Sequence, residues 1–203
     1  MSRLIALAIL CLCCSGIVRA EDAVTSTDST QKPLFEPAKT MVAVLPTASK
    51  VTDAIVRDAK AAENAKRMVE EEFSKRGFRL VNADDLANGL KKAKFDPTDV
   101  ESITKTKLTE VGRELGADIV AHVTLQQFES EARNVVVIRM KVWDVKAEAY
   151  LVNGIFKAEK KTISRKKGRM AALEQAVEKS LEDVLKPYRI IENPKESPAG
   201  EAK

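Results

Sequence analysis

The chain is poor in the residues from which most catalytic and metal sites are built. It has three cysteines and one histidine in 203 residues, and aromatic residues make up only 4%. The cysteines lie together near the N-terminus, at Cys11, Cys13 and Cys14. If residues 1–20 are removed, no thiol is left for a disulfide, a nucleophile or a thiolate metal site. A single histidine gives too few ligands for zinc or copper, so we expect no cofactor and no metal site.

Residues 1–20 have the three parts of a secretion signal. Arg3 supplies the early positive charge, residues 4–14 are almost wholly apolar, and Val18-Arg19-Ala20 places small residues where signal peptidase cuts. The apolar run is too short to cross a bilayer as a helix, which takes about 20 residues. The sequence therefore predicts cleavage between Ala20 and Glu21 and a mature chain without a transmembrane segment. The alternative is a lipid anchor on Cys14, because Cys-Ser-Gly is a common start of bacterial lipoproteins.

The charges are nearly balanced, with 34 Lys and Arg against 30 Asp and Glu, and the formal net charge is +4. This balance does not indicate a nucleic-acid partner. The sequence contains no Asn-X-Ser/Thr glycosylation site, so nothing indicates a eukaryotic secretory route. We expect a periplasmic or secreted bacterial protein, or an outer-membrane lipoprotein if Cys14 is lipidated.

The hydrophobic pattern predicts one α/β domain over residues 40–188. Residues 21–39 and 189–203 are rich in polar residues and proline without periodicity, which predicts a disordered leader and a disordered tail. The predicted strands are 41–46, 78–81, 119–128, 134–145 and about 150–163; the predicted helices are 52–76, a short one after Asn82, 97–115 and 169–186. The order is β-α-β-α-α-β-β-β-α. Helical connections make the first three strands parallel, and short turns make the last three antiparallel. The fold class is therefore α/β (α+β), a mixed sheet with helices packed on it.

Several polar and glycine positions have structural explanations. Gly77 and Gly116 are expected to end helices, and Asn82 is expected to cap one whose first turn holds Asp84 and Asp85. Glu70, Glu71 and Glu72 are expected on the outer side of the first helix, because Val69 and Phe73 form its inner side.

Three segments together resemble a group of bacterial envelope domains. They are KRGFRLVNADDLANGLKK (75–92), ELGADIVAHVTL (114–125) and IRMKVWDVKAE (138–148). They are similar to the periplasmic domain shared, in varied form, by the curli-secretion lipoprotein CsgG, the penicillin-binding-protein activator LpoB and the N-terminal domain of TolB. The resemblance implies the α/β fold of this group, a location in the cell envelope, and a non-enzymatic function in binding other envelope components. It does not imply pore formation, because the chain has no insertion long enough for membrane-spanning hairpins.

No residue is assigned a catalytic role. His122 is expected to be a partly buried strand residue that hydrogen-bonds locally. The sequence contains no phosphate-binding loop, dinucleotide-binding motif or Gly-x-Ser-x-Gly nucleophile motif. We therefore expect a binding or accessory protein of the cell envelope. The alternative is an exported hydrolase that uses unidentified carboxylates, and a deep pocket with two close carboxylates would favour it.

The expected binding surface is basic. Residues 157–169 contain one acid, Glu159, and many bases, which are Lys157, Lys160, Lys161, Arg165, Lys166, Lys167 and Arg169. They could keep a sheet edge soluble or bind an anionic partner. In the strand 134–145, Arg139, Lys141 and Trp143 share a face opposite an apolar one, which predicts an open sheet face with Trp143 as a binding hot spot. The alternative is that the leader or the last helix covers Trp143. The expected partner is an envelope protein or an anionic envelope component, and the oligomeric state stays open.

Overall fold

The computed structural model describes residues 34–51, 59–130, 134–161, 165–188 and 190. The predicted signal peptide, its cleavage site at Ala20 and Glu21, Cys14 and the predicted tail from residue 191 onward all lie outside these residues. Described residues begin within the predicted leader: a 3-10 turn, η1, spans Pro37–Lys39, and the Phe35 amide donates a hydrogen bond to the Tyr188 hydroxyl at 2.9 Å. Among the described residues, no helix is long and apolar enough to cross a membrane.

The predicted mixed sheet is confirmed. Its strands are β1 (Met41–Val44), β2 (Ala48–Ser49), β3 (Arg79–Leu80), β4 (Ile119–Ser130), β5 (Asn134–Asp144) and β6 (Ala149–Lys160). Their order is β3-β1-β4-β5-β6, and β2 pairs with β4 beyond the end of β1. The pairs of β1 with β3 and with β4 are parallel, whereas β4, β5 and β6 form an antiparallel meander. The short strand β2 was not predicted, because Pro46 marks the end of the apolar run.

The helices follow the predicted order with different starting points. They are α1 (Ala59–Ser74), α2 (Ala83–Lys92), α3 (Lys105–Glu114) and α4 (Arg165–Leu185), with a 3-10 turn, η2 (Val100–Ser102), before α3. The predicted start of the first helix at 52–58 lies outside the described residues. The predicted helix start at Pro97 is wrong, because the Thr104 side chain accepts from the Lys107 amide and caps α3 there. The last helix begins four residues before the predicted Arg169.

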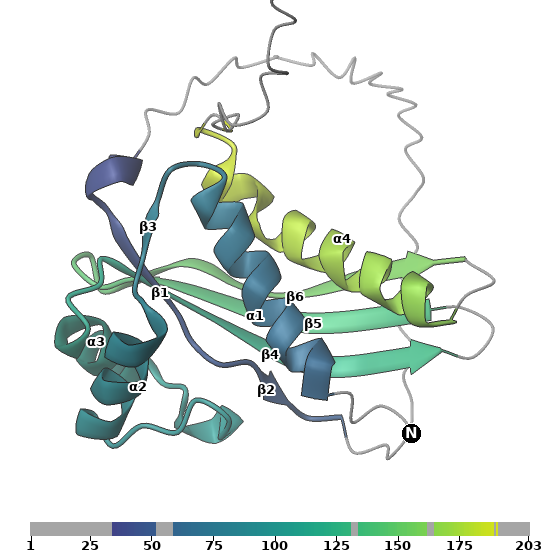
Figure 1. The fold of residues 1–203 in the computed structure, drawn as a ribbon, viewed down its shortest axis with the longest axis horizontal. Helices are drawn as coiled ribbons and strands as arrows, with labels where there is room; N and C mark the ends of the chain where they lie inside the picture. The colour runs from purple at the N-terminus through teal and green to yellow at the C-terminus, as the bar shows by residue number, and fades with distance from the viewer. Residues whose placement is uncertain (1–33, 52–58, 131–133, 162–164, 189, 191–203) are drawn as a thin grey trace, which may run out of the picture. The chain divides into compact units, whose positions relative to one another are not determined.

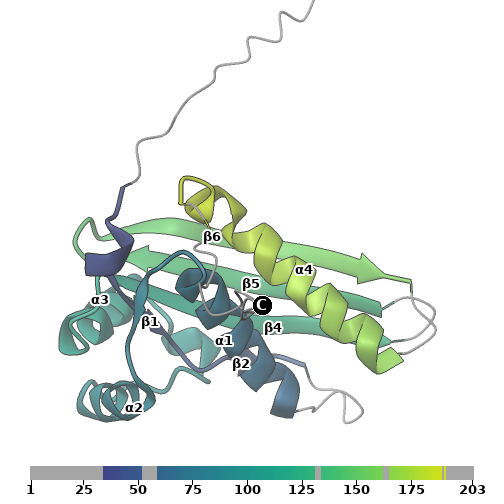
Figure 2. The same cartoon turned by 45° about the horizontal axis from the view of Figure 1, so that its top comes forward.

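The sheet carries helices on both faces, but unequally. Helices α1 and α4 lie side by side on one face, and α2 and α3 lie at one end of the other face (Figures 1 and 2). The larger core lies under α1 and α4 and takes Val136, Ile138, Met140 and Val142 from β5. The smaller core lies under α2 and α3 and contains Leu108, Val111, Val120 and Trp143.

Helix α3 approaches the sheet closely at a glycine. A Cβ atom on Gly112 would lie 2.3 Å from Val145 Cγ2 and 3.0 Å from Val120 Cγ2, both in the smaller core. The absence of a side chain at Gly112 therefore sets how near the helix axis comes to β4 and β5. Leu115, just after the end of α3, is half-buried and packs against the smaller core.

Gly116 ends α3 in the left-handed region, as the sequence predicts. Its φ is +61°, and an added Cβ atom would have no atom within 4 Å. The penalty for a side chain is therefore conformational, and we expect Gly116→Ala to lower the free energy of unfolding by about 1 kcal/mol. Asparagine tolerates this region better, so Gly116→Asn should lose less. Urea unfolding of both variants measures the difference; an unchanged midpoint for Gly116→Val would contradict this helix end.

Candidate binding surface

Trp143 does not lie on an open sheet face. It is 1% exposed, and its Nε1–H donates to the Thr109 hydroxyl on α3 at 3.0 Å. The Tyr150 ring of β6 packs edge-on against the indole at a centroid distance of 4.7 Å. The prediction that Trp143 is an exposed hot spot is wrong. The alternative of a covered Trp143 is correct, but α2 and α3 cover it rather than the leader or the last helix.

Lys141 shares the face of Trp143 and is also used internally. Its Nζ donates to the Ile103 carbonyl at 2.6 Å, and burial followed by the nearby Arg139 charge lowers its pKa. The cation therefore holds the segment between η2 and α3 against β5. Lys141 is half-buried, and its Nζ atom is already bound within the chain.

His122 lies opposite Lys141 on β4 and is fully buried. Its Nε2 lies 3.1 Å from the Pro97 carbonyl oxygen, so the neutral ring donates from Nε2. Burial lowers its pKa to about 4, and the Lys141 charge acts in the same direction while the Pro97 hydrogen bond opposes them. The local hydrogen bond that was predicted is present, and the burial is greater than predicted. In the part of the chain described here, no three His, Cys, Asp or Glu residues are grouped to hold a metal ion.

Beyond the edge of the smaller core, the same sheet face opens to solvent. Here Val137 and Arg139 of β5 face Lys157 and Ile155 of β6, respectively. Ile155 is 55% exposed, and Lys157 is exposed beside it. The Nε atom of Arg139 is buried, and no described residue gives it a hydrogen-bond partner. An apolar strip with unpaired cations therefore remains on this half of the face.

The basic residues of the segment 157–169 lie in three different places. Lys157, Lys160 and Lys161 lie on or just after β6, and the residues that the structure describes offer these lysines no ion pair. Lys167 is exposed on α4, whereas the Arg169 guanidinium carbon lies 5.2 Å from the centroid of the Phe128 ring. The side chains of Arg165 and Lys166 lie outside the described set. We define the basic edge as Arg139, Lys157, Lys160 and Lys161.

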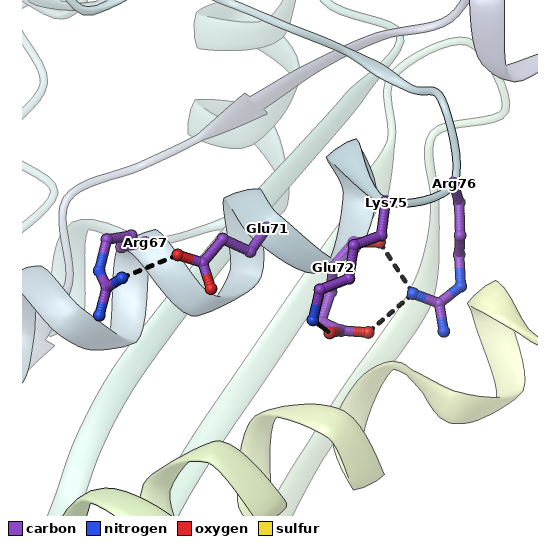
Figure 3. A network of polar contacts seen from close by, with 5 residues as sticks. All are labelled: Arg67, Glu71, Glu72, Lys75 and Arg76. Atoms are coloured by element: carbon purple, nitrogen blue, oxygen red, sulfur yellow. Dashed lines mark hydrogen bonds and ion pairs between the residues drawn. The ribbon is translucent and has the colours of Figure 1, made fainter. Parts of the chain in front are cut away.

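The acidic residues of α1 do not all face solvent. Glu72 is turned toward α4, with its side chain 12% exposed, and binds Lys75 at 2.8 Å and Arg76 at 2.7 Å (Figure 3). Burial alone would raise the pKa of Glu72, but hydrogen bonds from both cations more than offset it and the pKa is lowered. The expectation that Glu72 lies on the outer side is wrong, whereas Glu71 is exposed and pairs with Arg67.

One cavity is lined by three carboxylates, those of Glu36, Asp118 and Asp144, and so bears on the hydrolase alternative. It has a volume of about 410 Å³ and is lined in part by Asp118, Asp144 and Lys146. Asp118 accepts from the Met41 amide at 2.9 Å and pairs with Lys146 at 2.7 Å. Asp144 accepts from the Lys146 and Ala147 amides, both at 2.9 Å. Asp118 and Asp144 therefore hold a strand start and a turn in place, and Glu36 pairs with Lys39 at 2.6 Å, which explains all three without catalysis.

Comparison with known proteins finds similarity in structure but not in sequence. No protein-family model matches the chain, and no curated protein matches it. The lipoprotein GNA1162 from Neisseria meningitidis superposes with a TM-score of 0.51 at 13% identity, over 71% of this chain and 99% of that one. The LpoB C-terminal domain from Salmonella enterica gives 0.46 at 15% identity, over 63% and 86%. The PelC dodecamer subunit from Paraburkholderia phytofirmans gives 0.46 at 15% identity, over 73% and 87%.

The match to the Neisseria lipoprotein shows a shared fold, and a fold at this identity carries no function with it. LpoB, one member of the group that the sequence resembles, is among the structural neighbours. The resemblance to CsgG and to the TolB N-terminal domain stays a prediction.

Proposed function

We propose that this chain is an exported, non-enzymatic accessory protein of the bacterial cell envelope that binds an acidic component through the basic edge. The observation that carries the proposal is the placement of charge. The cations of the basic edge have no acidic partner among the described residues, and two of them, Arg139 and Lys157, adjoin an exposed apolar side chain, Ile155. Interfaces favour this combination of arginine and apolar contact area.

The side chains best suited to catalysis have internal roles, which supports binding over catalysis. His122 is buried against Pro97, and the carboxylates of Asp118 and Asp144 accept backbone hydrogen bonds.

The secretion signal predicted for residues 1–20 supports export, and the mass of the mature protein tests it. A mass beginning at Glu21 agrees with cleavage, whereas acylated Cys14 would place the protein on a membrane.

Charge reversal tests the surface. We expect the triple change of Lys157, Lys160 and Lys161 to glutamate to abolish capture of partners from an envelope extract at low salt, because attraction becomes repulsion. The matched control reverses Lys91, Lys92 and Lys94, which lie at the end of α2 and just beyond it, and should capture the same partners as the parent. The parent's capture should weaken as salt screens the charges over about 10 Å at 0.1 M. Equal capture by both triple variants at every salt concentration would refute the proposed surface.

A further inference from the structure

Strand β6 is a long edge strand with one free side. It spans Ala149–Lys160 and pairs with β5 along its whole length, with one register shift near Trp143. Among the strands that the structure describes, none pairs with its other side. A strand edge of this kind presents a row of backbone donors and acceptors that a second strand can bind.

The side chains of β6 indicate which strand would fit. On the open face, Asn153, Ile155 and Lys157 alternate outward, while Ala158 packs into the larger core. Lys160 shares the opposite face with Ala158. On the open face, Glu159 follows Lys157, Lys161 lies just after the strand end, and the neighbouring strand contributes Arg139 opposite Ile155. An incoming strand with acidic side chains on the same face would pair with these cations, since opposite charges on adjacent strands stabilise a sheet.

Resting on the proposed function, we infer that β6 binds an extended acidic segment of a partner protein as an added strand. A lipid surface would satisfy the charges but not the row of backbone groups. A second copy would bring another lysine-rich strand against the same edge. An acidic extended peptide matches both the backbone and the charge.

Synthetic peptides as long as β6 test the inference on the full mature protein. The first alternates glutamate with valine, the second is its ester analogue without backbone N–H groups, and the third alternates lysine with valine. We expect binding of the first, no binding of the third, and at least a hundredfold weaker binding of the ester, because it lacks every backbone N–H donor that would bind β6. Hydrogen exchange of the β6 amides should slow on binding of the first peptide alone.

The outcomes separate this inference from the proposed function. Equal affinity for the amide and ester peptides would overturn strand addition, while the loss of envelope capture on charge reversal would still support the surface. Slow hydrogen exchange of the β6 amides in the absence of peptide, together with a dimer mass in solution, would identify a second copy as the occupant and overturn the inference. No peptide binding to a parent protein that captures its envelope partner through the basic edge would overturn it too.

Discussion

Replacing Trp143 with alanine is expected to lower the free energy of unfolding by about 3–5 kcal/mol, because a fully buried large side chain leaves a cavity. The indole fills the space between β5, β6 and α3, and α3 has little freedom to move inward because Gly112 already places it close to Val145. The cavity therefore persists rather than collapsing. Urea unfolding followed by circular dichroism measures the loss.

Two conservative variants separate packing from hydrogen bonding at Trp143. Trp143→Phe keeps an aromatic ring beside Tyr150 and removes the donor to Thr109, so its loss should be smaller than that of the alanine variant. Thr109→Val removes the acceptor and leaves the indole N–H unpaired. We expect this single variant to lower the free energy of unfolding of the parent by about 1–3 kcal/mol. If Trp143→Ala unfolds at the parent's urea midpoint, the burial of this residue by α3 is contradicted.

Acid is expected to destabilise the protein through His122 before most carboxylates titrate. Its pKa is about 4 in the folded protein and about 6.5 in the unfolded chain. The unfolded state therefore takes up a proton first, and the neutral imidazole contributes stability that is fully present above pH 6.5. This stability falls as the pH drops through the window from 6.5 to 4, by about 3 kcal/mol in total.

The variant His122→Gln isolates this effect. Glutamine retains an amide donor for the Pro97 carbonyl but does not titrate, so its free energy of unfolding should fall by about 3 kcal/mol less between pH 7 and pH 4. The carboxylates titrate alike in both proteins and cancel in the difference. We expect capture of envelope partners to change little in this variant. Parallel pH profiles for parent and variant, or stoichiometric metal that is lost on the substitution, would show that His122 has another role.

Local sequence signals predicted most of the elements because their causes are local. Asn82 accepts from the Asp85 amide as a cap should, and Gly116 adopts the positive φ expected of it. The alternation of β5 correctly identified the face that meets α1 and α4. The error at Pro97 has a local cause as well: the Asp96 carboxylate binds the Thr98 amide and hydroxyl, which forms a turn that imitates a helix start.

The errors at the candidate site arose from contacts between distant segments. Strand alternation gives two faces but does not tell which segment covers the second one, so the covering of Trp143 by α3 was not predictable from β5 alone. The same holds for Lys141, whose acceptor Ile103 lies far away in the sequence. Asn153 and Gly154 interrupt the alternation of apolar residues in β6, yet they pair in register with Lys141 and Met140. The exposure of the β6 lysines, by contrast, could be predicted from the sequence, because so many closely spaced cations cannot all be buried.

The division into two cores decides what different spectroscopic probes report. The chain's one tryptophan belongs to the smaller core, so indole fluorescence reports the docking of α2 and α3 on the sheet. The circular dichroism signal of helices draws largely on α1 and α4, the two longest of the described helices, which cover the larger core. Coincident curves from the two signals mean that both cores melt together. An earlier fluorescence change, most pronounced in acid where His122 is protonated, means that the smaller core opens first as a separate cooperative unit.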